Sequence, residues 1–372
     1  MTQEEQICSL ALMRIPGLGP VGMHRLLSTM GSARDIFAYR EELSERVPGI
    51  SPKVVAALDC PEAFRRAELE LAFCEKKQIQ CFTLNDVSYP ARLRECDDAP
   101  PVLFYRGNAD LNTRRVINMV GTRHATSYGQ GICNQFLADL SEYCPDVLVV
   151  SGLAYGIDIH AHRAALKNNL RTIGVLAHGL DRIYPAVHRK TAVDMLEQGG
   201  LLTEFMSGTT PDRQNFVRRN RIVAGMSDAT IVVESAAKGG ALITAELAES
   251  YHRDCFAFPG RIEDEYSAGC NHLIRTNRAM LITSAEDFVQ AMRWENMQSQ
   301  TAKEIQRELF PALSEEEERI VSLLQKIPDG LQINTLVVDT NIPVHQMTAL
   351  LFELEMKGII RALAGGVYRL IR

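Results

Sequence analysis

The chain has 372 residues, of which 46% are hydrophobic and 23% charged. This balance excludes a collagen-like, largely disordered or membrane-spanning chain, and the length predicts two or three domains. The 40 Lys and Arg against 46 Asp and Glu give a net charge of −6, so any polyanion site must be a local basic cluster.

The cysteines and the N-terminus both indicate a cytoplasmic protein. The nine cysteines form no CxxC pair, which argues against structural zinc and for reduced thiols. The first residues, MTQEEQICSL, are acidic where a secretory signal is basic. No apolar run reaches the ~18 residues that a membrane span needs.

Residues 1–72 predict a small helical domain of helix-hairpin-helix or SAM-like type. Residues 15–20 (IPGLGP) and 47–52 (VPGISP) each combine an apolar residue, a tight Pro-Gly turn and the start of a new helix. They form a weak internal repeat.

Residues 73–290 predict an α/β domain with a Rossmann-like parallel sheet. Short apolar runs alternate with helical stretches, which is typical of a parallel sheet covered on both faces. The predicted strands are residues 80–84, 102–106, 116–120, 147–150, 172–177, 201–204, 229–234, 255–258 and 279–282. In this fold class ligands bind beyond the carboxyl ends of the strands.

The last part of the sequence predicts a linker and a winged helix. Residues 291–313 are polar and Gln-rich, which is typical of a linker, and residues 314–372 form the second module. Its predicted elements are helices over 315–325, 333–339 and 343–357 and a hairpin over 359–370 that turns at Gly365-Gly366.

The third helix of this module is a poor candidate for a DNA-reading helix. It carries Glu353 and Glu355 against Lys357 and His345. Because affinity for DNA rests on neutralised phosphates, we expect this module to contact protein, or another part of this protein, rather than DNA.

Polar and glycine residues follow two of the predicted strands. Gly121 and Arg123 follow residues 116–120, and Ser151 and Gly152 follow residues 147–150. Glycine at such a turn lets backbone amides face an anion at a helix N-terminus, and an arginine adds a two-pronged phosphate donor. The GxGxxG fingerprint is absent, which argues against an NAD enzyme.

Asp158, His160 and His162 suggest a metal site, but their spacing argues against one. Residues two apart on a helix point away from each other, so His160 and His162 cannot chelate one ion. We expect Asp158 to cap its helix and the three residues to have structural roles, with no metal bound.

The strongest local signal is residues 213–221, RQNFVRRNR, which hold four arginines, one aromatic and no acid. Arginines suit backbone phosphates, and an exposed phenylalanine offers a face on which unpaired bases stack. The alternative is a solvated helix face with the phenylalanine buried. The candidate DNA-binding residues are Arg213, Phe216, Arg219, Asn220 and Arg221.

A further anion-friendly turn follows residues 229–234. Lys238 supplies positive charge there, and Gly239 and Gly240 precede a helix. Together with the turns after the other strands, it predicts a groove lined for the phosphates of a single strand.

These motifs, in this order, resemble the DNA-processing protein A (DprA/Smf) family. The matching segments are Gly121-Thr122-Arg123, 151–166, 216–225, 238–245, Pro259-Gly260 and 269–274. Val217 replaces the family's proline, and Gly239 and Ala241 replace its two serines, which removes two hydroxyl donors.

The resemblance implies a non-enzymatic protein without a cofactor that binds single-stranded DNA in its Rossmann-like domain. It also implies a homodimer that protects incoming DNA and helps to load the RecA recombinase during natural transformation. The competing hypothesis is a nucleotide-cleaving enzyme similar to the phosphoribohydrolases, whose glycine-rich loop is partly matched by Gly239-Gly240 and Glu246. Nothing in the sequence pairs a nucleophile with a base for such an enzyme.

Overall fold

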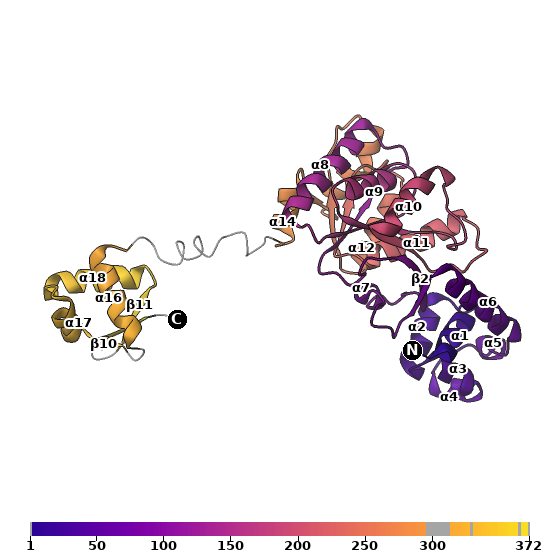
Figure 1. Ribbon diagram of the computed structural model, residues 1–372, viewed down its shortest axis with the longest axis horizontal. Coiled ribbons are helices and arrows are strands. Elements are labelled where there is room, and N and C mark those ends of the chain that lie inside the picture. The colour runs from indigo at the N-terminus through magenta and orange to yellow at the C-terminus, as the bar shows by residue number, and fades with distance from the viewer. Residues whose placement is uncertain (1, 295–312, 328–329, 364–365, 371–372) are drawn as a thin grey trace. The chain divides into compact units, whose positions relative to one another are not determined.

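The computed structural model describes residues 2–294, 313–327, 330–363 and 366–370 (Figure 1). The chain divides into two compact units, Met1–Glu295 and Asn296–Arg372. Within the described ranges, no helix is both long enough and apolar enough to serve as a membrane span.

The first unit begins with a bundle of short helices. These are α1 (Gln3–Leu12), α2 (Pro20–Met30), α3 (Ala33–Ala38), the 3₁₀ helix η1 (Arg40–Glu42), α4 (Leu43–Arg46), α5 (Pro52–Ala57) and α6 (Pro61–Lys77). The predicted boundary between residues 72 and 73 falls inside α6.

The two hairpin segments have the same backbone conformation. Gly17 and Gly49 have φ of 77° and 78°, and each follows a proline, which is the pattern of a type II turn. Each following amide closes its turn: Leu18 N–H donates to Ile15 O, and Ile50 N–H donates to Val47 O. The internal repeat is therefore also a structural repeat.

A nine-stranded sheet forms the centre of the first unit. Its strands are β1 (Gln80–Thr83), β2 (Val102–Gly107), β3 (Val116–Val120), β4 (Leu148–Ser151), β5 (Arg171–Val175), β6 (Gly199–Thr203), β7 (Ala229–Val232), β8 (Asp254–Ala257) and β9 (Met280–Leu281). The strand order is β1-β2-β6-β5-β4-β3-β7-β8-β9. All nine predicted strand segments are confirmed.

The sheet is parallel from β6 to β9, but β2 runs antiparallel to both of its neighbours, so the expectation of a wholly parallel sheet is wrong at this edge. Only α7 (Ala91–Arg94), a helix of four residues, lies between β1 and β2. A parallel crossover usually runs through a full helix, which this connection lacks, and the two strands pair as an antiparallel ribbon.

Helices cover both faces of the parallel part, which explains the continuous apolar runs of its strands. On β3, Ile117 and Met119 join the core formed with α8 (Ser127–Tyr143), α9 (Ile157–Lys167) and α14 (Ala285–Ala291). Val116 and Val120 join the opposite core, formed with α11 (Arg213–Gly225), α12 (Gly240–Ser250) and α13 (Ala268–Arg275). The remaining helices are η2 (Ala186–His188), α10 (Arg189–Glu197) and η3 (Glu265–Ser267).

The chain reverses its direction of strand addition between β3 and β7. After β3, the strands β4, β5 and β6 follow outward on one side, and β7, β8 and β9 follow on the other. The loops that leave the carboxyl ends of β3 and β7 therefore diverge. In open α/β sheets this is the place where a ligand binds.

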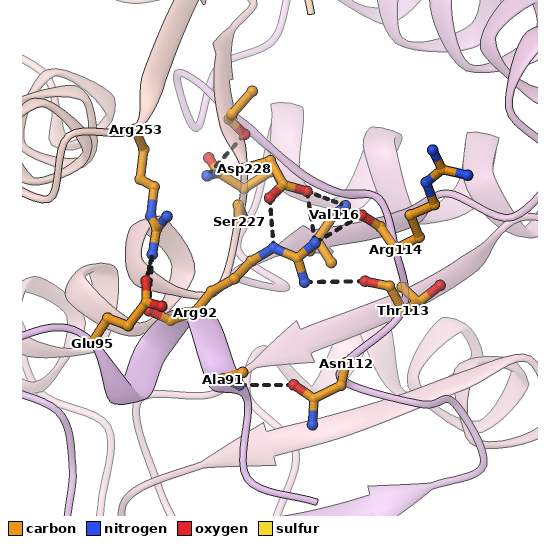
Figure 2. A network of polar contacts seen from close by, with 12 residues as sticks. Ala91, Arg92, Glu95, Asn112, Thr113, Arg114, Val116, Ser227, Asp228 and Arg253 are labelled. Atoms are coloured by element: carbon orange, nitrogen blue, oxygen red, sulfur yellow. Dashed lines mark hydrogen bonds and ion pairs between the residues drawn. The ribbon is translucent and has the colours of Figure 1, made fainter. Parts of the chain in front are cut away.

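A polar network fixes the opposite, amino end of the same strand pair (Figure 2). Arg92 from α7 donates to both carboxylate oxygens of Asp228, at 2.6 and 3.0 Å, and to the carbonyl oxygens of Thr113 and Arg114. Asp228 Oδ2 also accepts the Val116 N–H at 2.9 Å. The carboxylate just before β7 therefore holds the first residue of β3.

The helical bundle packs against the antiparallel edge of the sheet. Val102 and Phe104 of β2 belong to the same hydrophobic core as Leu71 and Cys74 of α6. The buried Glu70 carboxylate accepts the N–H and O–H of Ser207, after β6, at 2.8 and 2.6 Å.

The second unit has the three predicted helices and the predicted hairpin of a winged helix. Its elements are α16 (Glu315–Lys326), β10 (Leu331–Gln332), α17 (Ile333–Thr340), α18 (Val344–Met356), β11 (Ile360–Leu363) and β12 (Val367–Leu370), with the strand order β10-β12-β11. Residues 295–312 of the predicted linker, and Gly365 of the predicted turn, lie outside the described residues.

Lys357, which follows α18, adds little positive charge to that helix. Its ammonium lies 2.6 Å from the buried Glu317 carboxylate of α16. Phe352 and Met356 of α18 are 64% and 74% exposed.

We predict that Asp228→Asn lowers the free energy of unfolding by about 1–3 kcal/mol, because it removes the ion pair with Arg92 and weakens the bond to Val116. Urea denaturation of the full chain measures this change. Arg65→Ala is the control, since Arg65 and Glu62 form an exposed pair 3.9 Å apart whose loss has little effect. An unchanged urea midpoint for Asp228→Asn contradicts the anchoring role.

Candidate nucleic-acid interface

Three of the predicted segments meet at the carboxyl edge of the sheet. The Arg123 guanidinium, after β3, lies 5.0 Å from the centre of the Phe216 ring in α11. Arg219, one turn further along α11, donates through Nη1 to Gly152 O, after β4, at 2.6 Å. The structure thus brings the turns after β3 and β4 together with the first turns of α11.

Arg219 lies inside the protein, whereas the sequence suggested a phosphate contact. It is 4% exposed, and its Nη1 also donates to Val175 O at the end of β5. Burial lowers its pKa to about 10, while the nearby Asp158 carboxylate opposes that shift. Arg219 joins α11 to β4 and β5, because its guanidinium donates hydrogen bonds to the backbone carbonyl oxygens of Gly152 and Val175.

The sequence predicted that Asp158 caps α9, and this prediction is wrong. The Asp158 side chain bonds instead to the loop that precedes the helix. Its Oδ2 accepts the N–H of Gly152 at 3.1 Å and of Ala154 at 3.4 Å. Burial raises the pKa of this carboxyl group, and the Arg219 guanidinium lowers it. The pair stabilises the loop between β4 and α9.

Arg221 is also buried, at 5% exposed, and it pairs with an acid that the local sequence does not show. Its Nη2 lies 2.6 Å from Oε2 of Glu204, and Arg218 lies 2.9 Å from the same oxygen. Glu204 follows β6. Of the four arginines in the cluster, Arg213 alone is exposed without an ion pair among the described residues.

Phe216 lies at the centre of an aromatic and cationic surface. It is half-buried, and the Tyr184 ring is centred 6.0 Å from it at an angle of 56°. Tyr184 and Tyr155 are 46% and 48% exposed. Bases of a single strand can stack on such rings, and Arg123 adds a cation beside them.

The sequence analysis missed Tyr155 and Tyr184. Both lie in loops that leave the carboxyl ends of parallel strands, β4 and β5. Their place after those strands is the signal that could have identified them, since the carboxyl ends of parallel strands share one edge.

The turn before α12 is open to an anion. Gly239 provides no side-chain cap for α12, and Lys238 and Gly240 are exposed. Apart from its chain neighbours and the backbone of its own helix, no heavy atom lies within 4 Å of the position that a Gly240 Cβ would take. Lys238 makes no ion pair among the described residues. Free amides at a helix N-terminus and a lysine together suit a phosphate.

The other predicted residues shape the edge from inside. A Cβ on Gly121 would lie 2.3 Å from the Ile157 side chain. Ser151 is buried and donates to Met119 O at 2.6 Å. Asn220 is half-buried and accepts from Arg219 Nε at 3.3 Å. Gly121 and Ser151 therefore present no polar side chain to solvent.

His162 has the structural role that its spacing suggested. It is buried, and its Nδ1 lies 2.7 Å from Thr172 Oγ1. Burial lowers its pKa to about 3, which keeps the ring neutral at physiological pH. Among the described residues, no group of three His, Cys, Asp or Glu side chains is placed to hold a metal ion.

Comparison with known proteins gives two family matches. Residues 80–293 match the model described as DNA recombination-mediator protein A, and residues 307–366 match the DprA winged helix domain.

The chain is similar to named relatives over most of their length. It is 33% identical to protein Smf of Escherichia coli over 83% of both chains. It is 39% identical to the DNA processing protein DprA of Streptococcus pneumoniae over 58% of this chain and 75% of the relative.

Two solved structures are also similar. The Streptococcus pneumoniae DprA structure has a TM-score of 0.61 and 32% identity, covering 78% of this chain and 98% of that one. The Helicobacter pylori DNA processing protein A, described for its single-stranded DNA binding mode, has a TM-score of 0.52 and 29% identity, covering 57% of this chain and 96% of that one.

We predict that Gly152→Ala destabilises the protein by about 1–3 kcal/mol, because the new Cβ would come within 2.2 Å of the Arg219 guanidinium. Thermal unfolding followed by circular dichroism measures the loss. Gly240→Ala is the matched control, since its Cβ meets no atom. Equal melting temperatures for the two variants contradict the role of Arg219 in joining α11 to β4 and β5.

Proposed function

We propose that this chain, which belongs to the DNA recombination-mediator protein A family, binds single-stranded DNA along the carboxyl edge of its sheet and acts as a recombination mediator. The observation that carries the proposal is the cluster of Arg123, Phe216 and Tyr184 beside the open N-terminus of α12. The binding mode described for the Helicobacter pylori relative supports it.

The exposed cations and the aromatic rings take different parts of the strand. Arg123, Arg213 and Lys238 contact phosphates, because they are exposed and lie on three neighbouring segments of the edge. Phe216 and Tyr184 stack on bases. Phosphate contacts carry no sequence information and every base has a face, so the binding is independent of sequence.

The family match favours this proposal over the nucleotide-cleaving alternative. The matching family is described as a recombination mediator, a description that names no reaction. A purified sample separates the two hypotheses directly: release of base from nucleoside monophosphates supports the enzyme, and a gel shift of oligothymidine supports the DNA-binding protein.

The proposal includes a homodimer that acts in the cytoplasm, protects incoming DNA and helps to load the RecA recombinase during natural transformation. The cytoplasmic location rests on the cysteine pattern, and the other points rest on the family resemblance. One surface feature fits self-association: β9 lies at the edge of the sheet, and its Met280 and Leu281 are 57% and 48% exposed. An exposed apolar edge strand is a ready pairing surface.

We predict that the chain shifts oligothymidine at lower concentration than duplex DNA, and that Phe216→Ala weakens the single-strand affinity by roughly 1–3 kcal/mol through loss of one stacked base. Val217→Ala is the control, because Val217 is the adjacent residue and is 45% exposed but has no ring. A folded Phe216→Ala variant with unchanged affinity shows that the ring does not stack.

We predict that Arg123→Ala and Lys238→Ala each weaken binding to all oligonucleotides alike. Each should lower the slope of log affinity against log salt by roughly 0.7, the value for one lost phosphate contact on a single strand. Lys167→Ala is the control, since Lys167 is exposed in the last turn of α9, away from the carboxyl edge. A loss confined to one base composition, with the slope intact, argues against phosphate contacts.

A further inference from the structure

The helix that follows β3 begins where doubly wound folds place a ligand phosphate. In such folds the phosphate lies at the N-terminus of the helix beside the strand-order reversal, because the free amides and the helix dipole favour an anion there. The corresponding helix is α8, which begins at Ser127 after the Gly121-Thr122-Arg123 turn.

In this chain a side chain from the neighbouring strand already fills that place. The Glu234 carboxylate, after β7, accepts the Thr126 N–H through Oε2 at 2.9 Å. Its Oε1 accepts the Thr126 hydroxyl, and that hydroxyl oxygen in turn accepts the Gly129 N–H of α8. The carboxylate makes the contacts that a phosphate oxygen would make.

The fit of this carboxylate is tight. Glu234 is 2% exposed, and a Cβ on Gly129 would lie 2.2 Å from its Oε2. Glu234 forms no ion pair among the described residues. Its negative charge is therefore balanced by the Thr126 amide, the Thr126 hydroxyl and the positive end of the α8 dipole. A second anion would find neither space nor unpaired positive charge at this helix N-terminus.

The N-terminus of α12, on the other side of the reversal, remains open, as described for Lys238 and Gly240. A free nucleotide would therefore find one exposed phosphate position and no enclosed one. A strand that also reaches Arg123 and Phe216 adds several linked contacts, which together give far higher affinity than one contact alone.

We propose that Glu234 is a specificity-determining residue, whose carboxylate substitutes for a ligand phosphate at α8 and so excludes mononucleotides from a site that accepts a DNA strand. This inference rests on the proposed function. The inference goes beyond the proposed function because it assigns the selectivity against free nucleotides to one buried acid.

The test uses the full chain and two variants. Glu234→Ala empties the space that the carboxylate fills at the N-terminus of α8, and Glu234→Gln removes the negative charge but keeps that space filled. The probes are inorganic phosphate, dTMP and, as a ligand without phosphate, thymidine. Thermal unfolding and calorimetric titration report binding. Glu246→Ala is the matched control, because it removes one acid from α12 whose carboxylate instead pairs with Arg278 at 3.4 Å.

We expect Glu234→Ala to bind dTMP and phosphate at least about tenfold more tightly than the unaltered chain, Glu234→Gln and Glu246→Ala. Thymidine should stabilise none of them. If Glu234→Ala is unfolded without an anion, phosphate is expected to restore its folded circular dichroism signal. A variant that neither gains phosphate binding nor is rescued by phosphate overturns the proposal, as does tight dTMP binding by the unaltered chain.

Oligothymidine binding, measured on the same preparations, separates this inference from the proposed function. Failure of the unaltered chain to bind oligothymidine defeats the proposed function, whatever the phosphate result. Normal oligothymidine binding without a gain of phosphate binding in Glu234→Ala defeats only the role of Glu234.

Discussion

The pairing of β3 with β7 is the constraint on which the rest of the binding edge depends. These strands are neighbours although 112 residues separate Val116 from Asp228. Asp228 holds the amino end of the pair, and at the carboxyl end the Thr122 N–H donates to Glu234 O at 2.7 Å. Because both ends are fixed, the loops that carry Arg123 and Lys238 leave the sheet at a set separation, and the cationic edge is formed before any ligand arrives.

The sequence was sufficient to predict the strands and their helices, since buried parallel strands are apolar along their whole length. It was not sufficient to predict the direction of β2. The hydrophobic pattern of a strand is the same in both chain directions, and the connection between β1 and β2 has only the four-residue helix α7 where a parallel crossover usually has a full helix. The winged helix was equally accessible from its helical periodicity and its glycine turn.

The candidate site was predictable only in part. Arg123 and Lys238 could be located because they follow predicted strands, and parallel strands bring their carboxyl ends to one edge. The burial of Arg219 and Arg221 could not, because their partners come from distant segments: Gly152 O lies 67 residues away and Glu204 lies 17 residues away. A run of arginines without a local acid resembles an exposed patch until the tertiary fold supplies its acceptors.

The core shared by α6 and β2 bears on how this protein can change over evolution. The hydrophobic core of the helical bundle includes Leu71 and Cys74 of α6 and Val102 and Phe104 of β2. The bundle therefore covers one edge of the sheet. A gene rearrangement that exchanged the bundle for an unrelated module would leave that apolar edge in water, where exposed strands aggregate. Replacing the bundle in this chain would therefore also disrupt a core that the sheet shares, whereas the second unit has a hydrophobic core of its own.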